Sequence, residues 1–221
     1  LDMDEFFTGR TGLEIGGPSA FFYRIYEAAE ACDGVNFSES TVWSRGNAAE
    51  GYCYGGRRLG DFHLTDGVEL DGVGEKAYAF LLSSNNLEHI ANPMKALLKW
   101  REAVKTGGFL LIIVPNKEYS FDHRRDDTSF EHIWEDYLSN VGEDDLTHLE
   151  EILEKHDLEI DVRAGGLENF KRRSMENYQN RCLHHHVFNG ETLRRLLEAG
   201  SIETVEQGEF RECHYILGKI L

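Results

Sequence analysis

Cysteine is scarce in this sequence, and its placement excludes two common ways of stabilising a fold. Of the 221 residues only four are cysteines, and they are scattered without a CxxC pair: Cys32, Cys53, Cys182 and Cys213. This distribution argues against a disulfide framework and against a structural zinc site, and it favours reduced thiols in the cytoplasm. No basic stretch followed by an apolar run opens the sequence, so nothing in it predicts secretion.

Long apolar runs and positive charge are also lacking. The longest apolar run covers residues 109–114 and is far too short to cross a bilayer. Lysine and arginine number 23 against 40 aspartates and glutamates, which gives a formal net charge of −17. Such a charge repels nucleic acid phosphates and anionic lipids, so we expect no nucleic-acid partner and no membrane insertion. A small-molecule or carrier-linked partner fits this charge better.

Proline is equally rare, and each of the three prolines marks the boundary of a predicted element. Pro18 follows a short strand and glycine turn at 13–17, after which apolar residues recur at helical spacing with Ser19 as the N-cap. Pro93 follows Asn92, and this pair predicts the start of a helix. The third proline ends the long apolar run, which reads as a strand buried on both faces.

The remaining pattern is an alternation of strands and helices. Five strands are predicted. The first runs into the glycine turn within 13–17, and the others cover 78–82, 109–114, 202–210 and 213–220. One helix is predicted from Pro93, closed by residues 105–108 with their two glycines, and another follows Asn189 as its N-cap. Strands that alternate with helices predict an α/β fold with a parallel sheet and right-handed crossovers.

The segment 119–187 differs in composition from the rest of the chain. It is crowded with acidic residues and holds seven of the ten histidines. Helical periodicity is present in three places within it: around 129–139, 144–156 and 168–181. We predict that 1–118 and 188–221 form the core and that 119–187 is an inserted cap.

Six short motifs, in a fixed order and at fixed intervals, carry a family resemblance. They are Leu13-Glu-Ile-Gly-Gly-Pro-Ser19, Leu64-Thr-Asp-Gly67, Ser83-Ser-Asn-Asn-Leu-Glu-His-Ile90, Asn92-Pro93, Lys105-Thr-Gly-Gly108 and the apolar strand that follows. Together they resemble class I S-adenosylmethionine-dependent methyltransferases, in particular the bacterial methyltransferase-domain type associated with surface-polysaccharide genes. The resemblance implies a Rossmann-like, seven-stranded and mostly parallel sheet whose last strand is antiparallel, with a helical cap inserted after the fifth strand. It also implies S-adenosylmethionine as the cofactor.

The resemblance assigns cofactor binding to six residues at the predicted strand ends and turns: Glu14, Gly16, Gly17, Asn36, Asp66 and Ser84. Gly16 and Gly17 have no Cβ, so the backbone can approach a bound nucleoside closely. The positive end of the helix that follows suits the cofactor's carboxylate. Glu14 looks like the family residue that supports this loop and the cofactor's amino end.

Two of these assignments have alternatives. Asn36 stands where the family has an acidic residue that binds both ribose hydroxyls, and an amide accepts from a hydroxyl less strongly than a carboxylate does. Asp33 is the alternative ribose ligand. Asp66 resembles the residue that accepts a hydrogen bond from the adenine amino group, and the alternative is a solvated aspartate in a turn.

Histidines supply the candidate catalytic base, because transfer of a methyl group to a hydroxyl requires removal of a proton. The candidates are His89 and His123, with Asp122 beside the latter to orient it. Family members commonly have histidine where this sequence has Asn85, which leaves His89 as the nearby imidazole. For His89 the alternative is a structural ring that a backbone carbonyl satisfies.

The acceptor side is assigned to Arg124, Arg125 and His185. The two arginines directly follow the predicted fifth strand, where guanidinium groups would hold a phosphate or carboxylate in fork geometry. This predicts an anionic acceptor, such as a phosphorylated or nucleotide-linked sugar. Ordinary ion pairing with the many carboxylates of the cap is the alternative.

The histidine run 184–186 has two interpretations. It could join Asp144, Asp145 or His148 in a metal site, since Asp144 and His148 would share one face of a helix. We favour the other interpretation, in which one ring packs under the cap and the others face solvent or substrate. Methyl transfer from an already activated sulfonium needs no metal, so we expect none in catalysis.

The sequence therefore predicts an S-adenosylmethionine-dependent methyltransferase, with O-methylation of a small-molecule or glycan-precursor acceptor as the leading activity and N-methylation left open. A nicotinamide-dependent oxidoreductase is disfavoured, because the turn at 16–19 lacks the GxGxxG spacing that admits a pyrophosphate. A catalytically silent cofactor-binding protein is a second alternative, since Asn36 and Asn85 replace the residues usual in the family.

Overall fold

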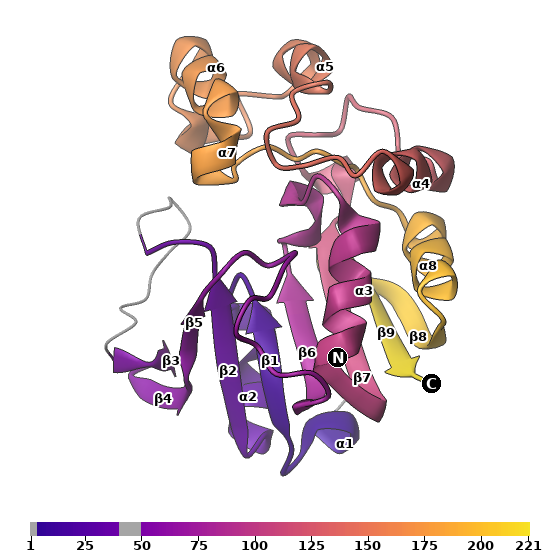
Figure 1. The fold of residues 1–221 in the computed structure, drawn as a ribbon. Helices are drawn as coiled ribbons and strands as arrows, with labels where there is room; N and C mark the ends of the chain where they lie inside the picture. Colours follow the sequence, from indigo (N-terminus) through magenta and orange to yellow (C-terminus); the bar gives the residue numbers. More distant parts are fainter. Residues whose placement is uncertain (1–3, 40–49) are drawn as a thin grey trace.

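The computed structural model describes residues 4–39 and 50–221 and contains a seven-stranded sheet in the order β5-β2-β1-β6-β7-β9-β8 (Figure 1). The strands of this sheet, in chain order, are β1 (Thr11–Ile15), β2 (Ala31–Asn36), β5 (Phe62–Leu64), β6 (Tyr78–Ser84), β7 (Val104–Pro115), β8 (Ile202–Phe210) and β9 (Cys213–Ile220). A separate antiparallel hairpin is formed by β3 (Tyr52–Tyr54) and β4 (Arg57–Gly60). The sequence pattern did not predict this hairpin.

The strand directions confirm the predicted Rossmann-like α/β fold. β1 pairs in parallel with β2 and β6, β2 pairs in parallel with β5, and β6 pairs in parallel with β7. β9 runs antiparallel to both of its neighbours, β7 and β8. The last strand of the chain is therefore the antiparallel one, inserted between two strands that run the other way. This arrangement brings the carboxyl ends of the parallel strands to one edge of the sheet.

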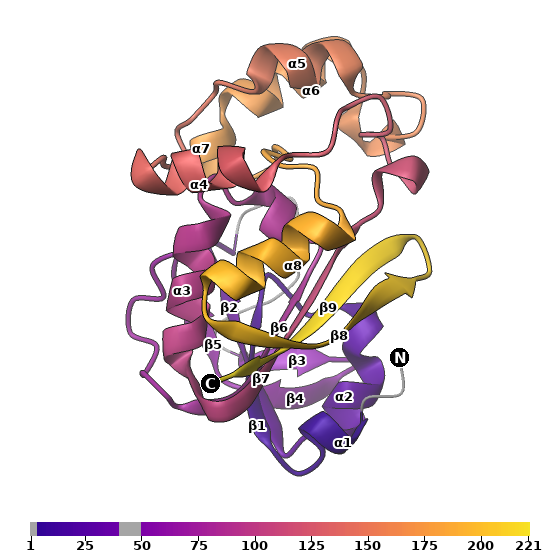
Figure 2. The same ribbon diagram turned by 90° about the vertical axis from the view of Figure 1, so that its right-hand side faces the viewer.

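Helices cover both faces of the sheet (Figure 2). Alternate side chains of the central strands belong to two apolar cores, one on each face. α3 (Pro93–Ala103) and α8 (Gly190–Ala199) pack on one face, and α1 (Asp4–Phe7) and α2 (Tyr23–Ala28) on the other. Within β7, Leu110 and Ile112 belong to the core under α3, whereas Leu111 and Ile113 belong to the core under α2. The period of two thus explains why 109–114 is continuously apolar.

The predicted helix starts are confirmed by their capping bonds. The Asn92 side chain accepts a hydrogen bond from the Lys95 amide at 3.0 Å, at the start of α3. The Asn189 side chain accepts one from the Thr192 amide at 2.9 Å, at the start of α8. Ser19 caps a short 3-10 turn, Ala20–Phe22, that leads into α2. Each cap satisfies an amide that the helix itself leaves without a partner.

The predicted end of α3 is wrong. The helix stops at Ala103, and residues 105–108 belong to β7 instead of closing the helix. Val104 is already extended, with φ −95° and ψ 139°, and it pairs with Tyr78 of β6. Burial of the Val104 side chain in the core beneath α3 favours this early entry into the strand.

The segment between β7 and α8 lies over the carboxyl edge of the sheet (Figure 1). Its helices are α4 (Phe130–Leu138), α5 (Leu149–Lys155), α6 (Leu167–Met175) and α7 (Asn177–Asn180), with 3-10 turns at Lys117–Tyr119 and Val162–Ala164. It has a small apolar core of its own, made by Ile152, Ala164, Phe170 and Leu183. No helix among the described residues is long and apolar enough to cross a membrane.

Two predicted helices in this segment are shorter than their periodicity suggested. The one predicted at 144–156 begins only at Leu149, because Asp145 accepts hydrogen bonds from the amide and the hydroxyl of Thr147 and holds a turn there. The one predicted at 168–181 is divided into α6 and α7 at Glu176, whose ψ of 22° departs from helical geometry.

Candidate functional site

A cavity of about 470 Å³ opens at the carboxyl ends of the parallel strands. Five of the six predicted cofactor-binding residues line it: Gly16, Gly17, Asn36, Asp66 and Ser84. On the side facing the segment over the sheet, the lining includes Glu88, His89, Arg163, Arg181 and His184. The cavity thus has a floor made by strand ends and turns and a wall made by segment 119–187.

The turn after β1 has no room for side chains. Gly16 has φ +80°, and a Cβ added there would lie 2.5 Å from the Asn86 side-chain oxygen. A Cβ on Gly17 would lie 2.1 Å from both the Glu14 carboxylate and the Tyr52 hydroxyl. Only glycine fits both positions, so the backbone itself forms this part of the cavity wall.

Glu14 supports this turn from beneath. It is completely buried, and its carboxylate accepts hydrogen bonds from the Tyr26 hydroxyl at 2.5 Å and from the Ser19 amide at 3.0 Å. Burial raises the pKa of Glu14 to about 7. The side chain does not border the cavity. Glu14 therefore holds the loop, as the resemblance implied, but it is the one predicted cofactor residue that lies behind the cavity wall.

Of the two candidates for the ribose, only Asn36 borders the cavity. Its amide group donates to the Gly17 carbonyl at 3.1 Å, which ties the end of β2 to the glycine turn. Asp33 instead lies away from the cavity. Its carboxylate accepts from the Asp61 amide and from the Tyr78 hydroxyl, both at 2.8 Å, so it is occupied in tying β2 to the residue before β5 and to the start of β6.

Asp66 is part of an ion-pair network in the cavity wall. One carboxylate oxygen accepts from the Val68 amide at 2.8 Å, and the other accepts from the Arg181 guanidinium at 2.8 Å. Arg181 also lies 3.3 Å from the Glu143 carboxylate and stacks over the Phe37 ring at 4.1 Å. Asp66 thus holds a turn, as the alternative had it, but its carboxylate is paired with Arg181 and not merely solvated. Each of its oxygens keeps a further lone pair, so the carboxylate can still accept a bond from a ligand.

Three titratable side chains meet where the cavity faces the segment over the sheet: Glu88, His89 and His184. Their potential ligand atoms lie within 4.8 Å of one another. Glu88 is 2% exposed, and neither carboxylate oxygen has a hydrogen-bond partner among the described residues. Burial raises the pKa of this carboxyl to about 7.

The two histidines of this group are held from behind in different ways. His89 Nδ1 lies 3.1 Å from the Leu183 carbonyl oxygen, and burial holds the pKa of this ring well below its usual range. His184 Nδ1 lies 2.5 Å from the Asp122 carboxylate. Burial by itself would lower the pKa of His184, but the charge and hydrogen bond of Asp122 outweigh it and raise the pKa. One ring is thus kept neutral while the other is made more basic.

Four predicted residues on the catalytic and acceptor side do not border the cavity: His123, Arg124, Arg125 and His185. His123 and Arg124 both contact the Asp157 carboxylate, at 3.0 and 2.6 Å. For Arg124 this is the ion pairing with acids of the cap that the sequence left as the alternative, and His123 is held by the same carboxylate outside the cavity.

Arg125 and His185 are buried within the segment. Arg125 is 3% exposed, and its guanidinium donates to Asp122 and to the backbone carbonyls of His184 and His185. It therefore fixes the histidine run and leaves no face for an acceptor. The His185 ring contacts the Asn177 amide at 3.0 Å. Of the run 184–186, the ring that reaches the cavity is His184.

Sequence reasoning missed Glu88, His184 and Arg163 as cavity residues. Glu88 directly precedes the predicted base His89 in the motif at 83–90, so its place in the cavity could have been predicted from the sequence. His184 was visible only as one of three equivalent histidines, because the pattern of an extended segment does not say which ring faces inward. Arg163 lies in a short 3-10 turn, and no signal in its neighbourhood points to a cavity.

Comparison with known proteins finds similarity in structure only. No family model matches the sequence, and no curated protein matches it. An S-adenosylmethionine-dependent methyltransferase from Mesorhizobium loti is 13% identical, with a TM-score of 0.57, 97% of this chain and 92% of that chain covered. The methyltransferase CalH in complex with SAH is 16% identical, with a TM-score of 0.56, 99% of this chain and 53% of that chain covered.

A third structure, of a protein from Bacillus halodurans, is 11% identical, with a TM-score of 0.53, 91% of this chain and 66% of that chain covered. The chain thus spans about half the length of CalH and 66% of the Bacillus protein. At these identities the likeness establishes a fold that methyltransferases share, and function has to be argued from the site.

Proposed function

We propose that this protein is an S-adenosylmethionine-dependent methyltransferase that binds its cofactor in the cavity at the strand ends. One observation carries the proposal. The side-chain-free turn Gly16–Gly17 opens into a cavity of about 470 Å³ at the carboxyl edge of the sheet, where open α/β sheets bind their ligands. The same fold occurs in structures described as S-adenosylmethionine-dependent methyltransferases, which supports the proposal at the level of fold.

The residues present fit this cofactor. The glycine turn would receive its methionine portion against bare backbone, and the Asn36 side chain borders the place for the ribose. Asp66 and Ser84 would contact other parts of the nucleoside and the methionine tail, and Glu14 would act through the turn. When bound, the cofactor supplies an activated methyl group on a sulfonium. The protein's own task is then to align an acceptor and to take its proton.

We assign proton removal to His184, with Asp122 as its positioning residue. The Asp122 carboxylate fixes Nδ1, which leaves Nε2 as the nitrogen available for an acceptor hydroxyl. His89 is the second candidate, and Glu88 the third, because a carboxyl with a pKa of about 7 can also accept a proton near neutrality. These groups support O-methylation, since a hydroxyl needs a base more than an amine does. His123 has no catalytic role in this proposal.

Segment 119–187 is proposed as the cap on the acceptor side, because it supplies Arg163, Arg181 and His184 to the cavity wall. Arg163 is exposed, lines the cavity, and makes no hydrogen bond or ion pair with any described residue. It takes over the anion-binding role that the sequence gave to Arg124 and Arg125. The glycan-related nature of the acceptor and the link to surface polysaccharides rest on the motif resemblance alone.

The test is a ligand titration followed by a search for the acceptor. Calorimetry with S-adenosylmethionine, its demethylated product, NAD and NADP should show binding of the first two only. Tight binding of a nicotinamide cofactor instead would favour the oxidoreductase. Incubation with isotopically labelled cofactor and a panel of sugar phosphates, nucleotide sugars and neutral sugars should transfer label to one class, as read by mass spectrometry. Cofactor binding without transfer to any small molecule would favour the catalytically silent alternative.

A further inference from the structure

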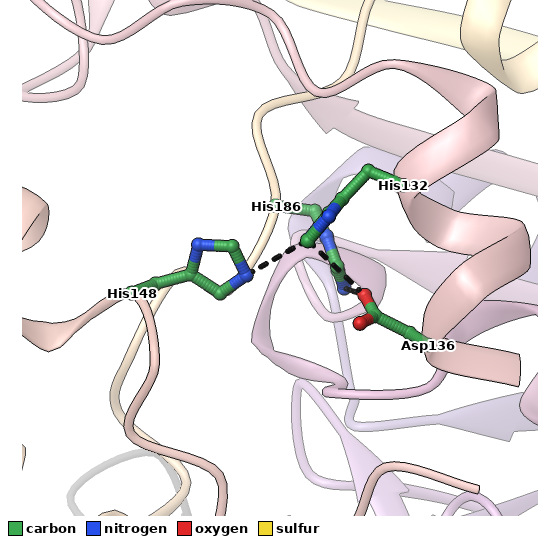
Figure 3. Close-up of side chains that lie close together, drawn as sticks. All are labelled: His132, Asp136, His148 and His186. Carbon is green, nitrogen blue, oxygen red and sulfur yellow. Dashed lines mark hydrogen bonds and ion pairs between the residues drawn. The ribbon is translucent and has the colours of Figure 1, made fainter. Parts of the chain in front are cut away.

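Four metal-ligating side chains meet within segment 119–187, outside the cavity (Figure 3). His132 and Asp136 stand one turn apart on α4, so they project from the same face. His148 immediately precedes α5, and His186 lies on the extended stretch that leads into α8. Three parts of the chain that are separate in sequence thus converge on one point.

The distances between the potential ligand atoms are close to those between donors that bind one small divalent ion. His132 Nε2 lies 3.0 Å from His148 Nε2 and 3.3 Å from the Asp136 carboxylate. His186 Nε2 lies 3.8 Å from the same carboxylate oxygen. One atom of each residue falls within 4.8 Å of all the others. Donors about 2.0–2.1 Å from a tetrahedral zinc are about 3.3 Å apart, so small ring movements complete the arrangement.

The hydrogen bonds that this cluster makes within the protein do not satisfy all of its polar atoms. The Asp136 oxygen that faces the histidines is buried and has no hydrogen-bond partner among the described residues, and the same holds for His186 Nδ1. The facing nitrogens of His132 and His148 can share only one proton, so one ring has to donate it to the other. Buried polar atoms without partners are costly, and a cation bound here would satisfy the Asp136 oxygen and relieve the two facing ring nitrogens of His132 and His148 together.

The donor set itself is one that a small divalent ion binds. Three imidazoles, from His132, His148 and His186, and one carboxylate, from Asp136, offer only nitrogen and oxygen atoms. This combination suits zinc.

We propose that His132, Asp136, His148 and His186 bind one zinc ion that ties α4, the start of α5 and the stretch before α8 together. His186 Nε2 also lies 3.2 Å from the Ala91 carbonyl, a contact that it exchanges for the ion while its proton moves to Nδ1. The site lies outside the cavity, so its role is structural. It fixes the backbone two residues from His184, and it does not depend on the proposed methyl transfer.

A second cluster makes the choice of variants important. Glu88, His89 and His184 also bring potential ligand atoms within 4.8 Å of one another, but they do so inside the cavity. Substitutions in this group therefore serve as matched controls for substitutions in the proposed site. His214, which pairs with Glu209 on the β8–β9 hairpin, controls for the loss of an imidazole elsewhere.

The first measurement is the metal content of the full chain after expression and exhaustive dialysis, by inductively coupled plasma mass spectrometry. We expect about one zinc ion per chain in the wild type. Asp136→Asn and His148→Ala should each reduce this to near zero, whereas Glu88→Gln and His214→Ala should retain it. Loss of zinc in Glu88→Gln with retention in Asp136→Asn would move the ion to the cavity and overturn the proposal.

The second measurement needs no variant of uncertain folding. The wild type stripped with a chelator should gain about 5–10 °C in Tm when zinc is added at a hundredfold excess over its Kd, and magnesium should give no such gain. X-ray absorption of the zinc form should show only nitrogen and oxygen ligands at about 2.0 Å, without sulfur. A wild type that carries no zinc and whose Tm does not respond to it would refute the site.

Discussion

Asp122 and His184 are separated by 62 residues in the sequence and joined by a hydrogen bond of 2.5 Å in the structure. Asp122 lies in the turn beyond β7, and His184 lies on the extended stretch before α8. The other oxygen of the same carboxylate accepts a hydrogen bond from Arg125 at 3.1 Å. Burial opposes the charge on Asp122, but His184 and Arg125 outweigh it and lower the pKa of this carboxyl. A buried, permanently charged carboxylate thus orients a ring that faces the cavity.

This relationship predicts that His184→Gln lowers kcat about 10²- to 10⁴-fold, the usual contribution of a positioned base. Asp122→Asn should lower kcat less and should move the acid limb of the pH–kcat profile to lower pH. The reason is that the neutral ring is the active form and Asp122 raises its pKa. His123→Gln, in the Asp157 ion pair outside the cavity, should behave as the wild type. A normal kcat in His184→Gln would transfer the role to His89 or Glu88.

Glu88 predicts a pH dependence of stability. Its pKa is about 7 in the folded protein against 4.5 in the unfolded chain, so its favourable contribution is complete below pH 4.5 and is lost as the pH rises through 7. At 1.36 kcal/mol per pKa unit, the loss is about 3 kcal/mol. Glu88→Gln should therefore lose less stability between pH 5 and pH 8 than the wild type, as measured by urea unfolding at each pH.

Glu150→Gln, an exposed change on α5, is the control for removing one negative charge. It should follow the wild-type pH dependence. If Glu88→Gln follows it equally, the Glu88 carboxyl does not stay buried and unpartnered in solution.

Gly16 and Gly72 form a matched pair for testing the cofactor site. Both have φ close to +80°, but an added Cβ meets Asn86 at 2.5 Å in the first and nothing within 4 Å in the second. Alanine therefore imposes the same backbone strain at both positions, about 1–2 kcal/mol. We expect Gly16→Ala to weaken S-adenosylmethionine binding at least tenfold by calorimetry and Gly72→Ala to leave it unchanged. Equal affinities in the two variants would place the ligand elsewhere.

The fold could be predicted largely from the sequence, because its signals are local. Asn92 and Asn189 sit directly before apolar residues at helical spacing, and the run 109–114 is apolar because both of its faces are covered. The end of α3 could not be read in the same way. Val104 leaves the helix because it pairs with Tyr78 in the sheet. This is a tertiary interaction, and the two glycines from which the helix end was predicted carry no information about it.

The candidate site was predictable on the strand side and not on the cap side. Gly16 and Asp66 follow short strands and Asn36 ends one. The carboxyl ends of parallel strands meet at one edge of the sheet, whatever path the loops take. The position of His184 depends on the path of the 74 residues, 116–189, between β7 and α8. Asp122 was assigned to His123, its neighbour in sequence, although it bonds to the distant His184. A contact between residues so far apart in the sequence produces no periodic pattern from which it could be predicted.

The last prediction concerns the charge of the acceptor and rests on the proposed function. Arg163 lines the cavity, whereas Arg124 is held by Asp157 outside it. If the acceptor carries a phosphate or carboxylate, Arg163→Ala removes a charged hydrogen bond worth about 1.5–3 kcal/mol, which corresponds to about a 10- to 150-fold rise in the acceptor KM. The kcat and the cofactor affinity should change little. Arg163→Lys keeps the charge but loses the planar fork, so its KM should lie between the two.

Arg124→Ala supplies the matched control, because it removes the same side chain from the same segment but outside the cavity, and its KM should equal that of the wild type. The decisive quantity is the preference for a phosphorylated acceptor over its neutral counterpart, measured for each variant with labelled cofactor. Loss of this preference in Arg163→Ala alone supports an anionic acceptor bound at Arg163. A wild type that prefers the neutral compound, or a preference lost only in Arg124→Ala, would contradict the assignment while leaving methyl transfer itself intact.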